Sequence, residues 1–242
     1  MNNWLERTEL LIGAEALLAL QSKKVLIVGL GGVGSFAAEF IARSGVGNIT
    51  IVDGDVVDVS NKNRQLVALD STIGKQKSLI MQARIMDINP AINLRVIPNF
   101  LNPRDTIELI KSNNFDYVMD CIDSLTPKLF LIEAAYNHQV KVISSMGAGA
   151  KKNSLLVTTV DISATYMCPF ASYIRKRLKK VNIQNGVMAV FSPEPAIKKS
   201  MKLTEGSRFK KSFYGTISHL PAQFGLHMAN WVINDIIDTS SN

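Results

Sequence analysis

The sequence has few cysteines and no long apolar run. Its 242 residues include two cysteines, Cys121 and Cys168, which are too few for a disulfide framework or a four-cysteine zinc site. No apolar stretch of about 18 residues occurs, so we expect no membrane span. The amino terminus lacks the basic start and apolar core of a secretory signal peptide. We therefore expect a protein of a reducing compartment, the cytoplasm.

Basic residues concentrate in one part of the chain. The formal net charge is +7 at pH 7, and residues 151–211 contain thirteen Lys and Arg against three Asp and Glu. A basic segment joined to a nearly neutral remainder favours a polyanionic partner that meets one region. The alternative is an ordinary solvated face. The candidates for contact with such a partner are Lys151, Lys152, Arg175, Arg177, Lys198, Lys199 and Lys202.

Strand-like and helix-like patterns alternate over the first 145 residues. Short apolar runs predict strands at 24–29, 49–53, 94–98, 116–120 and 140–145. Apolar residues at helical spacing predict helices at 33–43, 75–88, 105–111 and 127–138. This rhythm is typical of an α/β fold with right-handed crossovers. We expect a doubly wound, mostly parallel sheet of the Rossmann type.

Beyond residue 150 the pattern becomes less regular. Residues 155–160 and 187–191 predict strands, 169–180 predict a basic amphipathic helix, and 220–237 predict a closing helix. Residues 193–211 are polar and basic and contain two prolines and a glycine, which predicts a mobile loop. We expect one domain over 1–242, with a Rossmann-like core at 1–150 and a basic portion at 151–242.

A glycine pattern follows the first predicted strand and opens the first predicted helix. It comprises Gly29, Gly31 and Gly34, and it permits a tight turn with close approach of backbone to a phosphate at a helix amino terminus. Asp53 ends the next strand, where a carboxylate can accept both ribose hydroxyls. The combination predicts an adenine nucleotide without separating ATP from a dinucleotide. The alternative is a tight turn with no ligand.

Cationic and amide side chains follow soon after the ribose carboxylate. Asn61, Arg64 and Gln65 form a short run, and Lys77 lies on the next helix. A dehydrogenase does not break a phosphoanhydride and has no need of such a cluster, whereas an adenylating enzyme must stabilise charge on departing pyrophosphate. The alternative is that Arg64 and Lys77 are ordinary surface residues.

Two further charged residues depend on their context. Asp123 follows a predicted strand of the sheet and is a candidate to hold Mg²⁺ together with phosphates. Capping of the following helix by Asp123 or Ser124 is a close rival. Arg7 precedes the first strand and could reach the active site of its own or of a partner subunit.

These residues together resemble the ubiquitin-activating-enzyme-like (ThiF-like) adenylyltransferases. The matching positions are Gly29, Gly31, Gly32, Gly34, Asp53, Asp55, Ser60, Asn61, Arg64, Gln65, Gly74, Lys77, Asp120, Cys121 and Asp123. The resemblance implies that the glycines, Asp53 and Asp55 bind the nucleotide. It implies phosphate contacts from Asn61, Arg64, Gln65 and Lys77. It also implies that Asp123 serves Mg²⁺ or the reacting phosphate, and that Arg7 is donated across a homodimer.

Within that superfamily the chain is most similar to the tRNA threonylcarbamoyladenosine dehydratases. The similar runs are 7–13, 41–47, 87–90, 144–149 and 168–170. The zinc-binding cysteine pairs of the sulfur-carrier activators are absent, which favours the tRNA branch. The resemblance implies ATP and Mg²⁺ as cofactors and a tRNA bound by the basic portion. It implies adenylation of a threonine carboxylate, followed by ring closure.

Other functions stay open at this point. The first alternative is an adenylyltransferase that activates the C-terminal glycine of a ubiquitin-like sulfur carrier. The second is a non-catalytic nucleotide-binding module, and a dehydrogenase is more distant. Sulfur chemistry around relatives raises a sulfur-transfer partner and a persulfide on Cys168, although a plain structural cysteine is favoured.

Overall fold

A seven-stranded sheet forms the centre of the computed structural model, which describes residues 4–203 and 212–240. The strands are β1 (Lys24–Val28), β2 (Asn48–Val52), β3 (Asn93–Ile97), β4 (Tyr117–Asp120), β5 (Lys141–Ser145), β6 (Thr158–Asp161) and β7 (Val187–Phe191). Their order is β3-β2-β1-β4-β5-β7-β6. All neighbours pair in parallel except β6 with β7. The doubly wound, mostly parallel fold is confirmed.

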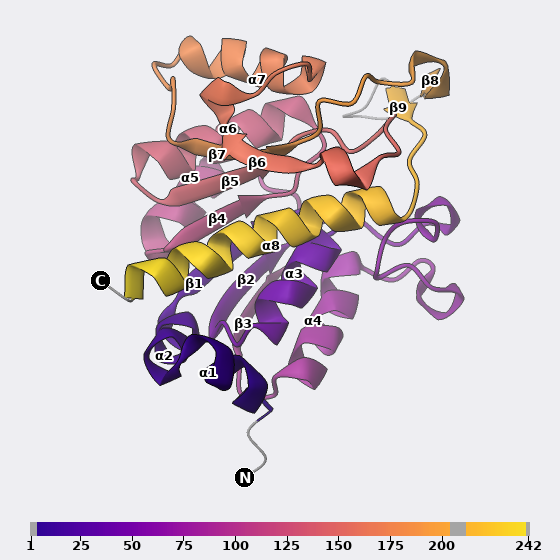
Figure 1. The fold of residues 1–242 in the computed structure, drawn as a ribbon. Helices are drawn as coiled ribbons and strands as arrows, with labels where there is room; N and C mark the ends of the chain where they lie inside the picture. Colours follow the sequence, from indigo (N-terminus) through magenta and orange to yellow (C-terminus); the bar gives the residue numbers. More distant parts are fainter. Residues whose placement is uncertain (1–3, 204–211, 241–242) are drawn as a thin grey trace.

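Helices cover both faces of the sheet (Figure 1). One face carries α1 (Glu6–Ile12), α2 (Ala14–Ser22), α3 (Gly34–Arg43), α4 (Lys77–Ile88) and α8 (His219–Ser240). The other carries α5 (Pro103–Asn113), α6 (Leu125–Asn137) and α7 (Pro169–Lys179). Among the helices within these described ranges, none combines the length and apolarity needed to cross a membrane.

The strands are apolar on both sides because each side faces a separate core. In β1, Val25 and Ile27 belong to the cluster under α3 and α8, while Leu26 and Val28 belong to the cluster under α6. Successive side chains of a strand point to opposite faces. A continuous apolar run is therefore what a strand buried on both faces requires.

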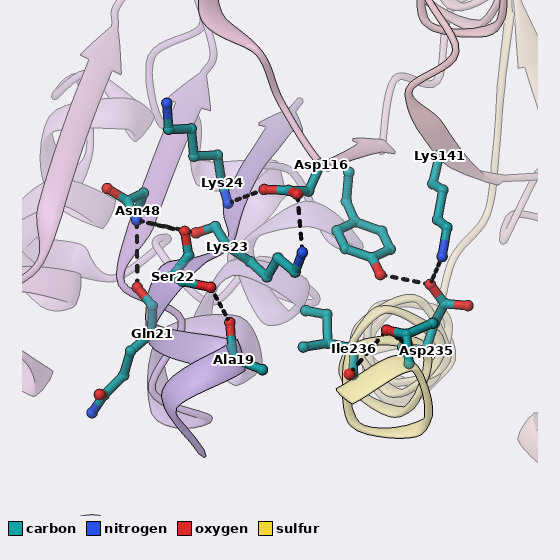
Figure 2. A network of polar contacts seen from close by, with 12 residues as sticks. Ala19, Gln21, Ser22, Lys23, Lys24, Asn48, Asp116, Lys141, Asp235 and Ile236 are labelled. Carbon is teal, nitrogen blue, oxygen red and sulfur yellow. Dashed lines mark hydrogen bonds and ion pairs between the residues drawn. The ribbon is translucent and has the colours of Figure 1, made fainter. Parts of the chain in front are cut away.

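A polar network closes the amino ends of the strands (Figure 2). Asp116 accepts hydrogen bonds from the Lys23 ammonium and from the Lys24 backbone N–H, at 3.2 and 2.8 Å. Nearby, Asp235 of α8 accepts from Lys141 Nζ at 2.6 Å and from the Tyr117 hydroxyl at 2.6 Å. Burial and the Asp235 carboxylate raise the pKa of Tyr117. These contacts fasten α8 to the end of the sheet that lies away from the glycine turn.

The basic portion completes the same sheet, and two of its expected elements differ in the structure. The run 155–160 is split into a 3₁₀ turn, Ser154–Leu156, and strand β6, because the Asn153 side chain accepts from the Leu155 N–H and turns the chain. The expected loop 193–211 instead contains a 3₁₀ turn, Lys198–Ser200, and β8 (Met201–Leu203), which pairs with β9 (Ser212–Tyr214). The remainder of that prediction, 204–211, lies outside the described residues.

Candidate active site

The candidate site lies at the carboxyl ends of β1 and β4. These neighbouring strands send their crossover helices, α3 and α6, to opposite faces of the sheet. Such a switch of direction opens a crevice at the strand ends where ligands of doubly wound proteins bind. Gly29 follows β1, Asp53 follows β2, and Cys121 follows β4. The structure thus brings three sequence-distant turns to one edge of the sheet.

The glycine turn needs glycine for two physical reasons. Gly29 has φ +91°, which L side chains rarely adopt, and a Cβ there would lie 2.9 Å from the Cys121 carbonyl oxygen. A Cβ on Gly34 would lie 1.7 Å from the Gly29 carbonyl oxygen. The turn therefore packs directly on the β4 turn and leads into α3 without side chains in the way. The turn before this helix start is partly exposed, and a helix amino terminus of this kind can bind a phosphate or other anion.

Asp53 fastens the glycine turn to the end of β2. Its carboxylate accepts from the Leu30 N–H at 2.6 Å and from the Asp55 N–H at 2.8 Å. Burial raises the pKa of the Asp53 carboxyl, and the Lys77 charge and the two N–H donors oppose that rise. Each carboxylate oxygen keeps lone-pair capacity for a further donor, as a ribose hydroxyl would be.

Arg64 lies against the glycine turn. Its Cγ atom is 3.4 Å from the place a Cβ of Gly32 would occupy. Its guanidinium donates to the Ser60 carbonyl and to Asn63 Oδ1, both at 2.9 Å. Burial lowers the pKa of Arg64, and the charge of Asp123 raises it. The charge of Asp123, which follows β4, therefore acts on a cation held beside the glycine turn that follows β1.

Lys77 and Asp55 form the second charged pair of the site. Lys77 begins α4, and its side chain is 6% exposed. Its ammonium contacts Asp55 Oδ2 at 3.0 Å, and Asp55 is more than half exposed. An ammonium has three donors, so one pairing leaves capacity for a phosphate oxygen. The arrangement holds a cation whose charge also acts on Asp53.

Two amide side chains complete the predicted set. Asn61 is buried, and its Oδ1 accepts from the Asp58 N–H within a capping box. Gln65 is buried with its amide nitrogen 3.7 Å from the Cβ position of Gly31, and its Oε1 has no hydrogen-bond partner. A buried amide oxygen without a partner is costly. A ribose hydroxyl or the adenine amino group of a bound nucleotide could donate to that oxygen, whereas a phosphate oxygen could not, so the residues present fit the nucleoside part of an adenine nucleotide.

The turn after β4 carries Asp123 without using it as the formal helix cap. Helix α6 begins at Leu125 with Ser124 at the N-cap, and Ser124 makes no side-chain capping bond. The Ser124 hydroxyl instead donates to Asp123 Oδ1 at 3.3 Å. Among the residues the structure describes, no group of three or more His, Cys, Asp or Glu could hold a metal ion. Any Mg²⁺ here would need oxygen ligands from the nucleotide.

Comparisons with known proteins agree with this geometry. Residues 5–242 match the model of the ThiF family. The chain belongs to the ThiF family. It is 39% identical over 238 residues to the tRNA threonylcarbamoyladenosine dehydratase of Bacillus subtilis, covering 96% of this chain and 93% of that protein. The family expected from the sequence is confirmed.

Solved structures of ThiF-family proteins resemble the whole chain. The Escherichia coli tRNA N6-threonylcarbamoyladenosine dehydratase in complex with AMP has a TM-score of 0.88 and 30% identity, covering 100% of this chain and 98% of that one. The same enzyme in complex with ATP gives the same TM-score, identity and coverage. The similarity therefore includes the basic portion as well as the Rossmann-like core.

The basic residues of this ThiF-family chain do not all face solvent. Lys152, Arg177, Lys198, Lys199 and Lys202 are exposed. Arg177 lies over the Tyr173 ring, 6.0 Å from its centroid.

Lys151 and Arg175 correct the expectation that all seven candidates meet a polyanion. Lys151 is 6% exposed, and its ammonium donates to the Ser192 carbonyl beside the Cys168 sulfur. Burial lowers the pKa of Lys151. Arg175 is half-buried and donates to the Thr165 carbonyl at 2.6 Å. The Lys151 side chain is thus buried and the Arg175 guanidinium is engaged by Thr165, which sequence composition cannot show.

Arg7 lies away from the glycine turn of its own subunit. It is exposed on α1, and the preceding Leu5 packs against Gly45, beyond the end of α3 opposite Gly34. A ten-residue helix spans about 15 Å. The structure therefore does not bring Arg7 together with Arg64 within one chain.

Cys168 is a buried residue at the start of α7. It is 5% exposed and occupies the N-cap position without a side-chain capping bond. Its sulfur lies 3.9 Å from Lys151 Nζ. This burial favours the structural interpretation over a persulfide acceptor, and the sulfur-transfer partner stays a prediction.

The segment that leads into α8 joins the basic hairpin to the nucleotide turn. Gly215 forms backbone hydrogen bonds with Ala150 and Ser200, and Asn63 Nδ2 donates to the Thr216 carbonyl at 2.9 Å. Pro221 lies 3.0 Å from the Cβ position of Gly32. Figure 1 shows the β8–β9 hairpin, the start of α8 and the loops after β2 at the same edge of the molecule.

The sequence patterns described above did not single out Lys128, although it is important to this edge of the sheet. Lys128 of α6 is fully buried and pairs with Asp120 at 2.6 Å. The signal was a lysine on the inward side of an apolar helix, one turn before Leu131 and Ile132. A long charged side chain is almost never fully buried unless it is paired. A lysine at an inward-facing helix position therefore indicates a buried acid nearby.

Proposed function

We propose that this chain is an ATP-dependent tRNA dehydratase that closes N6-threonylcarbamoyladenosine into its cyclic, hydantoin-type form. The observation that carries the proposal is the convergence of Arg64, Asp53 and the Lys77–Asp55 pair around the glycine turn. Support comes from relatives that carry the dehydratase name and match this chain along nearly its full length. Such a substrate is consistent with the cytoplasmic location expected from the cysteine content.

The reaction divides into adenylation and ring closure. The threonine carboxylate attacks the α-phosphorus of ATP, a mixed anhydride forms, and pyrophosphate leaves. A carbamoyl nitrogen then attacks the acyl carbon, loses its proton and expels AMP. The nucleoside loses one water, which is taken up in the cleavage of ATP to AMP and pyrophosphate. Adenylation is needed because an unmodified carboxylate oxygen is a poor leaving group.

The protein's contribution is fixed charge at the phosphates. Arg64 and Lys77 stabilise the negative charge that grows on pyrophosphate, because both cations are partly desolvated and held by neighbours. Asp53 holds the glycine turn and offers its remaining lone pairs to the ribose. Asp123 would hold Mg²⁺ together with phosphate oxygens, and the ion would neutralise phosphate charge.

The exposed lysines of the basic portion would bind the tRNA backbone. Lys198, Lys199 and Lys202 lie on the β8 side of the hairpin, and Lys152 lies beside it, where His219 Nε2 contacts the Lys152 carbonyl at 3.0 Å. Phosphate contacts of this kind position a nucleic acid without reading its sequence. The hairpin is tied to Asn63 next to Arg64, so RNA bound there would lie close to the adenylation site.

We also propose a homodimer in which Arg7 serves the partner's site. Helix α1 buries none of its residues, and its Leu10 and Leu11 are 81% and 85% exposed. A second copy of the chain would cover these leucines. If Arg7 acts in trans, mixing Arg7→Ala and Arg64→Ala chains restores activity that neither variant has alone, because a mixed dimer contains one complete site. Failure of the mixture would contradict this arrangement.

One assay tests the proposed function directly. The protein is incubated with ATP, Mg²⁺ and tRNA carrying threonylcarbamoyladenosine, and the nucleosides are analysed by mass spectrometry. Loss of one water mass together with AMP formation is the expected result, and Arg64→Ala serves as the inactive control. ATP–pyrophosphate exchange that requires a small protein ending in Gly-Gly would instead support sulfur-carrier activation and overturn the proposal.

A further inference from the structure

A fully buried ion pair lies directly beneath the candidate site. Lys128 and Asp120 are each 0% exposed, and Lys128 Nζ contacts Asp120 Oδ2 at 2.6 Å. The ammonium also donates to Ser144 Oγ at 3.2 Å and to the Ser145 carbonyl at 2.9 Å. Ser144 Oγ donates to Asp120 Oδ2 at 2.6 Å. All three donors of the ammonium therefore have acceptors, and these come from the carboxyl ends of β4 and β5.

Stability alone is a weak reason for such a pair. Two charges must be removed from water, and well-packed apolar side chains often stabilise the same space equally well or better. The surrounding core of α6, with Leu131, Ile132 and Ala135, is otherwise apolar. The pair has, however, a directional property that apolar residues lack, because its hydrogen bonds set the relative positions of two strand ends.

Asp120 also fixes the position of the turn that leads to Asp123. Its second carboxylate oxygen, Oδ1, accepts from the Ile122 N–H at 3.1 Å. The intervening Cys121 donates its N–H to the Val28 carbonyl at 2.9 Å. Its carbonyl oxygen lies against Gly29, 2.9 Å from that residue's Cβ position. The Asp120 side chain thus holds Cys121 and Ile122 at the glycine turn, and the charge of the next residue, Asp123, acts on Arg64.

Lys128 links the same turn to the loop after β5. The Ser145 carbonyl that it binds immediately precedes Met146, whose N–H donates to the Val190 carbonyl of β7 at 2.8 Å. The chain then continues through Gly147 and Gly149 to Ala150, which binds the Gly215 segment. One cation therefore joins the loop after β4, on the nucleotide side, to the loop after β5, which leads to the basic side.

We propose that Lys128 is a positioning residue for adenylation, acting through Asp120 on the turn that presents Asp123 to Arg64 and to the nucleotide. This inference rests on the proposed function. A displacement of about 1 Å in a reacting geometry costs roughly 100-fold in rate. Ground-state binding of ATP should change little, because Asp53 holds the glycine turn independently through the Leu30 N–H.

The test compares two variants with a matched control. Lys128→Met leaves Asp120 buried without its partner, so it measures whether the fold tolerates the loss. The double variant Asp120→Asn with Lys128→Met removes both charges and keeps an amide oxygen for the Ile122 N–H. Lys141→Met is the control, because Lys141 forms a 2.6 Å ion pair at the other end of β5, away from the crevice.

Each variant is characterised by its thermal unfolding, its kcat for AMP formation, its KM for ATP and its crystal structure. We expect the double variant to regain most of the thermal stability lost in Lys128→Met. Its kcat should stay down by about 100-fold with less than a threefold change in the KM for ATP, and its 121–123 turn should be displaced by about 1 Å. Lys141→Met should keep the wild-type kcat.

A double variant with an unmoved turn and wild-type kcat would overturn the inference, because the pair would then be structural only. Failure of the proposed function is a different result. It would appear as a wild-type chain that leaves the tRNA nucleoside unchanged, and the crystal structure of the double variant would still decide whether Lys128 positions the turn.

Discussion

The Rossmann-like core and the basic portion use charge in different ways. In the core, Asp53, Arg64 and Lys77 are buried or half-buried, and each is held by a hydrogen bond or an ion pair within the protein. In the basic portion, Lys198 and Lys199 are exposed on the turn before β8, and Lys202 is exposed on β8. Fixed, desolvated charges recognise one small ligand in one geometry. Exposed charges attract an extended polyanion through their summed field.

The largest expected effect is loss of one core cation. Arg64→Ala should lower the kcat of adenylation by about 100- to 1,000-fold, because a fixed charge on the departing phosphate is removed. The fold should persist, since the guanidinium contacts Ser60 and Asn63 of its own loop rather than a core. Measurement combines AMP formation with thermal unfolding.

Lys62→Ala is the matched control for that experiment. Lys62 lies two residues away and pairs with Asp70, whose side chain is 84% exposed. Its replacement should leave adenylation unchanged. If Arg64→Ala and Lys62→Ala lost equal activity, adenylation would depend on the total positive charge of the loop and not on the position of Arg64.

A second prediction concerns the exposed lysines together. Replacing Lys198, Lys199 and Lys202 by Gln should weaken tRNA binding. The slope of log affinity against log salt should fall by about 1 for each phosphate that a lysine no longer neutralises. Binding of ATP alone should not change. Filter binding over a series of salt concentrations measures the first effect, and calorimetry measures the second.

The control removes equal charge elsewhere. Lys24, Arg104 and Lys111 are exposed on the core, and their replacement by Gln should leave the salt slope near that of the wild type. The same slope in both triple variants would show that tRNA responds to net charge and not to the hairpin.

A third prediction uses pH to separate the two regions. Burial raises the pKa of Asp53 above its ordinary value of 3.8. An acid with a raised pKa in the folded state adds stability below its unfolded pKa, and this contribution is lost as the pH rises through the folded pKa. Asp53→Asn should remove that part of the pH dependence from the free energy of unfolding, measured by denaturant titration.

Protonation of Asp53 should weaken ATP binding, although it adds to the stability of the fold. ATP affinity should fall as the pH drops through the raised pKa, because a neutral carboxyl is a weaker acceptor for ribose hydroxyls. A flat affinity profile in the wild type would contradict this role for Asp53. Binding of tRNA to the exposed lysines should not follow this profile.

The smallest expected effect is at the contact between the regions. Asn63→Ala removes the hydrogen bond to the Thr216 carbonyl and the acceptor for Arg64. Exposed hydrogen bonds contribute about 0.5–1.5 kcal/mol, so we expect a two- to tenfold lower kcat with tRNA. Asn93→Ala, which removes a 2.9 Å bond to Asn48 at the amino end of the sheet, is the control.

Local patterns predicted much of the nucleotide side. The spacing of Gly29, Gly31 and Gly34 between a strand and a helix, followed by Asp53, specified the turn and its anchor before any contact was known. Such positions follow from short-range rules, because a tight turn excludes side chains and a strand end presents its last residue to the crevice. The hairpin of β8 and β9 was missed, since polar residues with prolines carry a weak strand signal.

The sequence by itself determined the order of strands and helices, the glycine turn and the family, since these depend on residue type and spacing along the chain. The tertiary structure decided which charges meet. The charge of Asp123 acts on Arg64 from a distant part of the chain, Lys151 is buried while Lys152 is exposed, and Lys128 pairs with Asp120 beneath the site. Burial and pairing depend on how helices pack on the two faces of the sheet, and local periodicity does not contain that information.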